Sequence, residues 1–443
     1  MTDQRTTGVQ VTGRSVTSQQ APGQKIAVVG AGIAGLASAY LLSRQHAVTL
    51  FEAGDYLGGH TRTVDVTVEG KTVPVDTGFL VFNDRTYPNL IALFKELGVA
   101  SLETDMSFGV TLDGGRFEWA GTNLDTVFAQ RRRLLSPTFY LMLRDILRFN
   151  RNAHANLQAA LVSDITLGQL LDQGGYSQVF RDAYLLPMAA AIWSSPTGDI
   201  LRFPAATFLR FCINHALLQV NDRPKWRSVA NGGRNYVERI AATLRDIRLS
   251  TPVQGVIRTS QGVRLQTAHG TEDFDAVVFA THAPTTRRML SDADADEAAV
   301  LDAVRYQANT ALLHTDPSFL PRRRKVWSAW NYVGGAAVEG ARPVCVSYLI
   351  NQLQPLPFQT PVIVTLNPFR EPAADKLLGR FDYEHPLLDH AATRAQQKLP
   401  AIQGRRRAWF AGAWTGYGFH EDGLKSALRV AADFGVRPAW ATT

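Results

Sequence analysis

Six residues near the start of the chain, at positions 30–35, read GAGIAG and fill the spacing G-x-G-x-x-G. Gly30 is expected to make a tight turn, Gly32 to let the backbone approach a pyrophosphate, and Gly35 to let a helix pack close to a sheet. The N-terminus of that helix offers free N–H groups to phosphate, and Ile33 and Ala34, just before it, are expected to bind the cofactor. The spacing therefore predicts that this segment binds a dinucleotide.

The segments around these glycines are those that dinucleotide binding requires. An apolar run at Ile26–Val29 precedes the glycines, a helix is predicted over Leu36–Arg44, and a second apolar run covers Ala47–Glu52. Glu52 lies about twenty residues past the first glycine, where the motif places a carboxylate for a ribose hydroxyl. Strand, helix and strand in this order predict a parallel, Rossmann-type sheet. The alternative is a glycine-rich turn in an unrelated α/β fold.

Two further glycine turns favour FAD over a nicotinamide cofactor. Gly58 and Gly59 are followed by His60, Thr61 and Arg62, and two adjacent glycines let a second backbone segment approach a phosphate chain. The C-terminal run over residues 409–430 predicts a strand, a turn at Gly412, an aromatic loop and a helix. Asp422, Gly423 and Leu424 stand at the start of that helix. Its N–H groups could face the pyrimidine edge of an isoalloxazine ring, which becomes anionic on reduction.

Together these motifs resemble the flavin-containing amine oxidase superfamily, which includes monoamine and polyamine oxidases, protoporphyrinogen oxidase and phytoene-desaturase-like enzymes. The positions that match are Gly30, Gly32, Gly35, Glu52, Gly58, Gly59 and Gly412. The resemblance implies that the backbone at Val253 meets the adenine. Two positions depart from the pattern, because His60 stands where the superfamily usually has Arg and Ala413 where it usually has Glu. Arg62 is a candidate to replace the missing positive charge.

Longer strings resemble one subfamily, the predicted FAD-dependent oxidoreductases associated with bacterial cyclopropane-fatty-acid-synthase-like methyltransferases. The strings are VDTGFLVFNDRTYPNL (75–90), DMSFGVTLDGGRFEWAG (105–121), LPMAAAIWSSP (186–196), NDRPKWRSVANGGRNYVE (221–238), RYQANTALLHTD (305–316) and GYGFHEDGL (416–424). The oxidase-like half of plant cyclopropane fatty acid synthases is similar. This resemblance implies a fatty-acyl substrate and a lipid methyltransferase as a partner.

Three residues of the C-terminal loop are the candidates for chemistry at the flavin. Trp414 and Tyr417 could form the aromatic pair by which amine oxidases frame a substrate, or pack the loop onto the core. His420 could move a proton near neutral pH, or be a hydrogen-bonded structural histidine. Asp76 in the VDTGF turn could equally touch the ligand or hold backbone N–H groups. Asn231, Gly232 and Gly233 match the superfamily's Gly-Gly stretch under the flavin and substrate cavity, and the alternative is a simple turn.

The sequence predicts a two-domain α/β flavoprotein in which the Rossmann-type FAD-binding domain is discontinuous. That domain is expected over residues 25–82, 222–284 and 404–437. A largely helical α+β substrate domain is inserted at 83–221 and 285–403. Within the insert, Ser136–Asn150 is the best-defined helix, with Ser136 as its cap and Pro137 at its first position.

Composition sets limits on the other partners. The chain has 443 residues, is 45% hydrophobic and carries a net charge of +7, and no nucleic-acid motif accompanies that charge. Its two cysteines, Cys212 and Cys345, lie far apart, so we expect no metal site and a reducing, cytoplasmic setting. Residues 1–24 are interpreted as a disordered tail. No apolar run reaches the roughly 20 residues of a spanning helix.

Two basic runs indicate peripheral membrane contact. Arg131–Arg133 precedes the helix at Ser136–Asn150, which has a broad apolar face, and Arg322–Lys325 precedes Trp327 and Trp330. Cationic side chains beside apolar ones suit an anionic membrane surface. The alternative is a helix that packs inward and arginines that are merely solvated.

The favoured function is an FAD-dependent dehydrogenase or desaturase that transfers hydride from a C–H bond of a modified fatty-acyl chain to flavin N5. An oxygen-using amine oxidase is the second hypothesis. The third is a flavin-binding partner of a lipid methyltransferase without turnover of its own.

Overall fold

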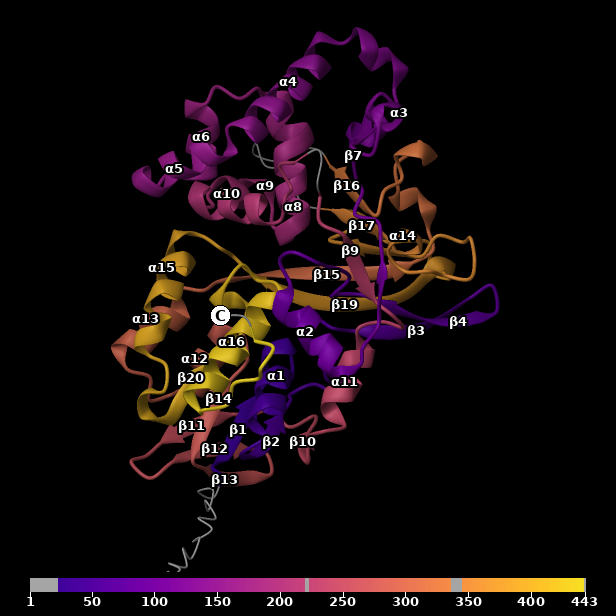
Figure 1. Cartoon of the computed structure of the whole chain (residues 1–443). Coiled ribbons are helices and arrows are strands. Elements are labelled where there is room, and N and C mark those ends of the chain that lie inside the picture. Colours follow the sequence, from indigo (N-terminus) through magenta and orange to yellow (C-terminus); the bar gives the residue numbers. More distant parts are fainter. Residues whose placement is uncertain (1–22, 220–222, 336–344, 442–443) are drawn as a thin grey trace, which may run out of the picture.

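A computed structural model of the chain describes residues 23–219, 223–335 and 345–441. The tail expected over residues 1–24 lies outside the described residues except for its last two positions. Figure 1 shows three layers: a parallel sheet with its helices, a second and larger sheet, and a helical lobe at the end of the molecule opposite the parallel sheet.

The parallel sheet is assembled from distant parts of the chain. Its five strands lie in the order β10-β2-β1-β14-β20, and their bounds are β1 (Lys25–Val29), β2 (Ala47–Phe51), β10 (Asp246–Arg248), β14 (Ala276–Phe279) and β20 (Ala408–Phe410). All four pairings are parallel. Such a sheet needs helices on both faces. The discontinuous Rossmann-type fold that the glycine motif predicts is therefore confirmed.

Each face of the parallel sheet has its own apolar core. One face is covered by α1 (Ile33–Leu42), α2 (Pro88–Leu97), α11 (Arg234–Ala241) and α16 (His420–Asp433). The other is covered by α12 (Ala283–Met289), α13 (Ala295–Asp302), α15 (His390–Lys398) and an antiparallel sheet of β11 (Gly255–Arg258), β12 (Val263–Thr267) and β13 (Gly270–Phe274). The helix α1 begins at Ile33, three residues before the predicted start.

The second sheet has seven strands in the order β19-β15-β18-β17-β16-β7-β8. Their bounds are β7 (Phe108–Leu112), β8 (Phe117–Ala120), β15 (Tyr306–His314), β16 (Trp330–Gly334), β17 (Val346–Leu349), β18 (Ile363–Leu366) and β19 (Leu377–Pro386). Only the pairing of β16 with β7 is parallel. Two small sheets join the layers: the hairpin of β3 (Thr63–Val68) and β4 (Lys71–Asp76), and β5 (Phe82–Asn83) with β9 (Trp226–Val229) and β6 (Ser101–Glu103).

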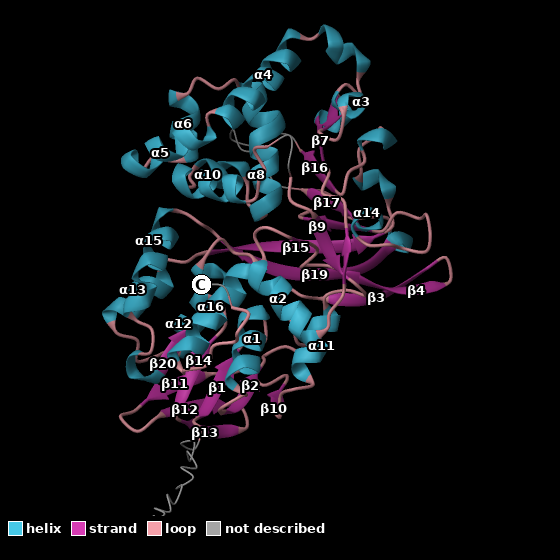
Figure 2. Cartoon of the chain, in the orientation of Figure 1, coloured by secondary structure: helices cyan, strands magenta, loops and turns pink. Residues whose placement is uncertain are grey.

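The helical lobe packs over one face of the seven-stranded sheet (Figure 2). Its helices are α3 (Leu124–Val127), α4 (Pro137–Arg151), α5 (Ala153–Ser163), α6 (Leu167–Gln173), α7 (Gln178–Phe180), α8 (Leu186–Trp193), α9 (Thr197–Leu201) and α10 (Ala205–Asn214), and the short α14 (Ile350–Leu353) adjoins the sheet. The predicted cap of α4 is confirmed, since the Ser136 hydroxyl accepts the N–H of Phe139 at 3.4 Å. In the part of the chain that the structure describes, no helix is both long and apolar enough to cross a membrane.

Four helices that fall wholly or mostly in the expected substrate segments pack against the parallel sheet instead. The helix α2 falls in the expected substrate segment 83–221, yet Leu90 and Leu93 are buried in one core with α1 and α16. Similarly, most of α12 and all of α13 and α15 fall within 285–403 but pack against the parallel sheet. A helix joins whichever sheet its apolar face meets, and the position of that sheet cannot be read from a local pattern.

Candidate active site

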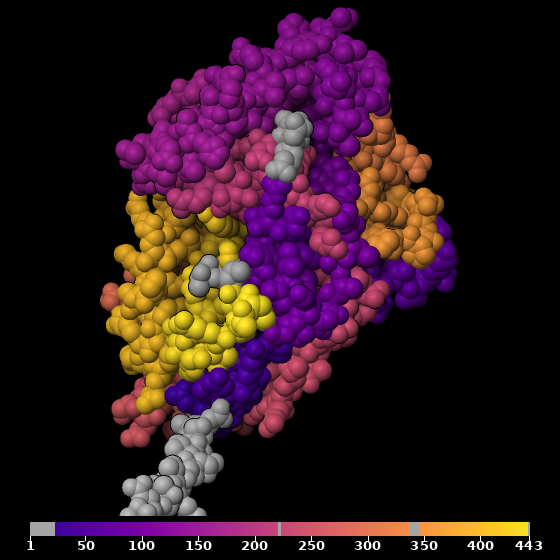
Figure 3. Space-filling view, viewed as in Figure 1, coloured from indigo at the N-terminus to yellow at the C-terminus, as the bar shows by residue number. Residues whose placement is uncertain are grey.

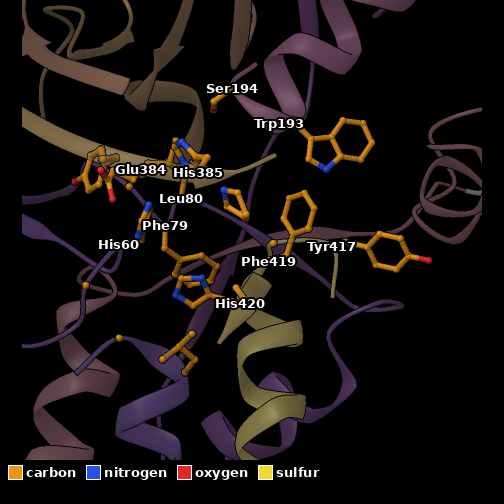
Figure 4. A pocket seen from close by; sticks show the side chains of 18 of the residues that line it. His60, Phe79, Leu80, Trp193, Ser194, Glu384, His385, Tyr417, Phe419 and His420 are labelled. Carbon is orange, nitrogen blue, oxygen red and sulfur yellow. The ribbon is translucent and has the colours of Figure 1, made fainter. Parts of the chain in front are cut away.

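A cavity of about 470 Å³ lies between the parallel sheet and the seven-stranded sheet. Figure 4 shows its interior, with His420 at one side and Trp193 and Ser194 at the other. The predicted site residues that line it are Gly30, Gly32, Ile33, Ala34, Glu52, Gly58, Gly59, His60, Gly412, Trp414, Tyr417 and His420. Those that do not line it are Gly35, Thr61, Arg62, Val253, Asp422, Gly423 and Leu424. The two ends of the chain thus meet at one cavity.

In the first glycine turn, the fold requires glycine at positions 30 and 35 but not at position 32. Gly30 has φ of 100°, in the left-handed region, and a Cβ at Gly35 would lie 1.7 Å from the carbonyl oxygen of Gly30. Gly32 has φ of −70°, which any residue adopts, and a Cβ there would meet nothing within 4 Å. Packing therefore makes no demand on Gly32. The open space over it, at the N-terminus of α1, is the room that a pyrophosphate needs.

The second glycine turn closes against the first. The N–H of Gly58, which has φ of 115°, donates to the Ala31 carbonyl at 2.8 Å. A Cβ at Gly59 would lie 3.1 Å from the Cα of Gly32. The two turns form a single backbone cradle that side chains would fill. An FAD pyrophosphate fits this cradle, and the residues present match the cofactor.

Glu52 stands at the end of β2 beside the cradle. Its Oε2 accepts the N–H of Ala31 at 2.7 Å, and its Oε1 accepts the N–H of Gly54 at 2.9 Å. Each carboxylate oxygen keeps a lone pair for a further donor. The carboxylate is therefore held where ribose hydroxyls can donate to it, as the motif predicts.

His60 faces the cavity, whereas Arg62 turns away from it. The Nε2 atom of His60 is buried and has no hydrogen-bond partner among the described residues. Burial lowers the pKa of His60 well below its usual value, and the neighbouring His385 and His282 act in the same direction. The guanidinium of Arg62 lies 4.1 Å from the Tyr56 ring centroid and packs over a second ring. His60, rather than Arg62, thus presents an unpartnered ring nitrogen to the cavity, where it can form a hydrogen bond to a cofactor.

The C-terminal helix approaches α1 closely. A Cβ at Gly423 would meet Cγ2 of Ile33 at 2.7 Å, so only glycine allows this crossing of α16 and α1. Leu424 is fully buried in the shared core. Gly412 has φ of 151° and leads from β20 into the loop before α16. The N-termini of both helices therefore point toward the cavity, and their free N–H groups suit the two anionic parts of FAD.

The two acidic residues at the start of α16 cap helices. The Glu421 carboxylate accepts the N–H groups of Asn89 and Leu90 at 3.1 and 3.0 Å and thereby caps α2. The Asp422 carboxylate accepts the N–H of Phe419 at 3.0 Å and caps its own helix. Burial raises the pKa of Asp422 to about 6. Of the acidic and basic cluster at 420–422, only His420 lines the cavity.

His420 is fixed by contacts from three distant segments. Its Nε2 lies 2.7 Å from the Thr61 hydroxyl and 3.3 Å from the Tyr236 hydroxyl. Its ring stacks on Phe79 with centroids 3.6 Å apart. Burial lowers the pKa of His420 to about 3. A histidine with this pKa is neutral at pH 7, and of the two interpretations left open for His420, the hydrogen-bonded structural histidine matches these contacts.

Trp414 and Tyr417, the expected aromatic pair, both line the cavity, and no ring contact joins them in the described structure. Trp414 is almost fully buried in the core beneath the cavity. Tyr417 packs against Phe211 at 5.7 Å, and Figure 4 shows its ring directed away from His420. Instead, Phe419 and Phe211 stack at the cavity wall with centroids 4.9 Å apart.

Three other predicted positions lie outside the cavity. Val253 is buried in the core between β10 and β11. Asp76 is buried at the end of β4, where its Oδ1 accepts the N–H of Gly233 at 2.9 Å and the Thr63 hydroxyl at 2.5 Å. Asp76 thus ties the turn at 232–233 to the hairpin. Of the two interpretations left open for Asp76, the structural one matches these contacts.

The half of the cavity farthest from the cradle is mostly apolar, with Ser194 as a polar residue beside Trp193. Its walls come from α8, the end of α10, the seven-stranded sheet and the segment after β4. The residues are Leu80, Val81, Met106, Ala191, Ile192, Trp193, Leu217, Trp226, Trp330, Tyr348, Val364 and Leu366. The two carboxylates that line the described cavity, Glu52 and Glu384, both lie elsewhere: Glu52 at the cradle, and Glu384 3.0 Å from Nδ1 of His282. This half suits apolar groups, and its described lining offers no carboxylate to an ammonium group.

Comparison with known proteins agrees with this geometry. The family model described as flavin containing amine oxidoreductase matches residues 33–434. The carotenoid phi-ring synthase of Streptomyces griseus is 28% identical over 335 residues, which is 70% of this chain and 61% of that protein. The putative flavin-containing monoamine oxidase AofH of Mycobacterium tuberculosis is 29% identical over 272 residues, which is 58% of this chain and 56% of that protein. The chain thus matches less than two thirds of the length of either relative.

Solved structures share the fold. A CLA-producing fatty acid isomerase from P. acnes aligns with a TM-score of 0.65 and 15% identity, covering 94% of this chain and 99% of the other. Putrescine oxidase bound to putrescine aligns with a TM-score of 0.66 and 16% identity over the same shares. At such identities the likeness extends to the architecture alone.

Proposed function

Because the chain belongs to the family of flavin-containing amine oxidoreductases, we propose that it is an FAD-dependent dehydrogenase or desaturase of an apolar chain. The substrate class is a fatty-acyl chain, including one that already carries a methyl or cyclopropane group. The observation that carries the proposal is the apolar half of the cavity, which continues directly from the cofactor cradle.

The chemistry of the cofactor sets what the protein must do. When bound, FAD would accept a hydride from a substrate carbon together with the proton lost by the neighbouring carbon, so that FAD becomes FADH2 and the chain gains a C=C bond. The protein must therefore hold an unreactive chain in one position and keep water away from it. Ile192, Trp193 and Leu217 supply a wall for such a chain, and each methylene that leaves water favours binding by about 0.8 kcal/mol.

Residues at the junction of the two halves position the chain and the cofactor. His420, held by Thr61 and Tyr236, and Phe79, stacked on it, form one rigid group between the cradle and the apolar half. Phe211 and Phe419 form a second aromatic wall. Rigid walls of this kind fix which carbon approaches the cofactor, since a misplacement of about 1 Å can cost a hundredfold in rate.

An amine oxidase that uses oxygen is the second candidate. The relative named as a putative flavin-containing monoamine oxidase favours it, as does the aromatic wall. The lack of a carboxylate in the apolar half of the described cavity argues against a charged diamine, because an ammonium group buried there would have no partner.

The third candidate is a flavin-binding partner of a lipid methyltransferase that has no turnover of its own. In that case the protein binds FAD and the methyltransferase but no lipid reduces the flavin. Copurification of the two proteins, together with a flavin that stays oxidised in the presence of lipid, supports this third candidate.

Anaerobic reduction of the bound flavin separates the three candidates. Purified yellow protein is mixed with phospholipids that carry methylated or cyclopropanated acyl chains, with the unmodified phospholipids, or with monoamines and polyamines. Loss of the visible flavin absorbance with acyl chains alone supports the proposal. Loss with amines alone overturns it, and no loss with either leaves the non-catalytic partner.

A pair of variants tests whether the acyl chain binds in the apolar half of the cavity. Ile192 lines the cavity and Ile213 does not, and both side chains are half-buried in the lobe. Ile192→Asp places a charge on the apolar wall, so it should slow reduction by acyl chains at least about tenfold and leave the FAD spectrum unchanged. Ile213→Asp is the matched control, and its flavin should be reduced by acyl chains as fast as that of the wild type.

A further inference from the structure

Exposed apolar side chains gather at one end of the helical lobe. Five of them come from a single stretch of the chain: Leu124 on α3, Leu134 and Leu135 in the turn between α3 and α4, and Tyr140 and Leu147 on α4. Leu135 is 89% exposed and Leu124 is 78% exposed. In Figures 1 and 3 this stretch forms the end of the molecule farthest from the parallel sheet. We call these five residues, together with the arginines of the same stretch, the α3–α4 face. The arginines are Arg131, Arg132, Arg133, Arg144, Arg148 and Arg151.

The helix α4 presents two faces of different character. Phe139, Met142 and Phe149 are buried in the lobe core, so the broad apolar face expected from sequence packs inward. That part of the membrane expectation is therefore wrong. The outer face carries Tyr140, Arg144, Leu147 and Arg151, which follow one another at spacings of four, three and four residues. Apolar and cationic side chains thus alternate along one line of the helix.

The α3–α4 face is strongly cationic. Residues 124–151 contain six arginines and two aspartates. The buried Asp145 lies under the guanidinium groups of Arg144 and Arg148, and Asp125 pairs with Arg131 and Lys325. Arg132 and Arg133 both donate to the carbonyl of Arg116, and among the described residues neither pairs with a carboxylate.

The second basic run adjoins this face. Lys325 reaches Asp125 of α3 at 3.2 Å, and Arg323 pairs with the buried Glu118 at 2.6 Å. The short turn at Arg324–Val326 therefore packs against β8 and the start of α3. Structure places both basic runs of the sequence at the same end of the molecule.

We propose that the α3–α4 face docks on the surface of an anionic lipid bilayer. The exposed leucines and Tyr140 enter the boundary between headgroups and acyl chains, and the arginines contact lipid phosphates. A protein partner usually offers pockets for a continuous apolar core. Here single apolar side chains alternate with cations, a pattern that suits a headgroup layer.

This inference is independent of the substrate. The α3–α4 face shares no residue with the cavity, so vesicle binding can fail while flavin reduction succeeds, and the reverse. If both hold, the face brings the protein to the layer in which acyl chains are found.

Vesicle sedimentation with the full-length, FAD-loaded protein tests the proposal. We expect binding to vesicles of phosphatidylglycerol mixed with phosphatidylcholine and much weaker binding to phosphatidylcholine alone. Raising the salt from about 0.1 to about 1 M shortens the Debye length from about 10 to about 3 Å and should release most of the protein. Equal binding to both lipids, or none to either, overturns the proposal.

Matched variants locate the binding surface. The double variant Leu134→Asp, Leu135→Asp should weaken vesicle binding at least about tenfold, whereas Ile257→Asp, at a 53% exposed position on β11 across the molecule, should not. Removing two arginines with Arg132→Gln and Arg151→Gln should weaken binding about 25-fold, since each cation near an anionic surface is worth about fivefold. Arg264→Gln on β12 is the charge control.

Every variant is checked for retained FAD absorbance and an unchanged melting temperature before binding is measured. If the two control variants lose as much binding as the variants of the α3–α4 face, then nonspecific charge holds the protein on the vesicle and the proposed face is refuted.

Discussion

Replacing Gly32 by alanine separates cofactor binding from folding. Gly32 has a backbone conformation open to any residue, and its added methyl group would meet no protein atom within 4 Å. A Gly-to-Ala change at such a position stabilises by about 0.4–1 kcal/mol through the unfolded chain. Alanine is a poorer N-cap by a similar amount, so the two effects nearly offset. The free energy of unfolding of the FAD-free protein should therefore change by less than about 1 kcal/mol.

The same methyl group points into the space that the pyrophosphate needs. It would separate a phosphate from at least one N–H group at the start of α1. A hydrogen bond to a charged group contributes about 1.5–3 kcal/mol. The dissociation constant of FAD should therefore rise by about 10- to 150-fold.

Variants of two other glycines serve as controls for this measurement. Gly35→Ala would bring a methyl group to 1.7 Å from the Gly30 carbonyl oxygen, so it should prevent folding. Gly121→Ala meets only the edge of Trp119, at 4.0 Å, and lies outside the cavity, so it should raise stability by at most about 1 kcal/mol and leave FAD binding unchanged.

Fluorescence titration of FAD into the apoprotein gives the dissociation constant, and thermal unfolding of the same samples gives stability. A Gly32→Ala protein that melts like the wild type and binds FAD within about threefold of wild-type affinity would refute the cradle as the pyrophosphate site.

Three further changes test other parts of the structure. His60→Ala should raise the FAD dissociation constant about tenfold or more in the same titration, because the unpartnered Nε2 faces the cavity, whereas Arg62→Ala should change it far less. Burial raises the pKa of Asp76 to about 6, so between pH 4 and 6 the folded carboxyl keeps a proton that the unfolded chain releases. The free energy of unfolding should therefore fall by about 3 kcal/mol as the pH rises through this window and then stay level. Asp76→Asn should flatten that pH profile in urea unfolding. Glu421→Ala leaves the N–H groups of Asn89 and Leu90 without their acceptor and should lower the unfolding free energy by about 3 kcal/mol, while Lys425→Ala should have little effect because its ammonium group is 3.9 Å away and exposed.

Local signals explain what the sequence could predict. The turn at 30–35 and the cap of α4 are each encoded by neighbouring residues: glycines at fixed spacing in the first case, and Ser136 before Pro137 in the second. The matching of the two ends of the chain could also be predicted, because each end carries a glycine turn typical of a nucleotide site.

Nonlocal pairings explain what the sequence could not predict. The long strands β15 and β19 pair with each other across more than sixty residues, and neither has a clean alternation of apolar and polar residues. The strands β7 and β8 were hidden in a segment that reads as helical. The contact of Thr61, Tyr236 and His420 joins three elements that lie far apart in the chain, so Phe79 and Tyr236 gave no signal of their place beside the site.

The order of strands in the parallel sheet has a consequence for biosynthesis. β14 pairs with β1 on one side and with β20 on the other, and β20 is made only at residues 408–410. Until the ribosome has released nearly the whole chain, β14 therefore presents an open edge, and α16 is not yet available to pack on α1. The cavity can therefore be enclosed only after nearly the whole chain has been made, because residues 412–420 form part of its lining.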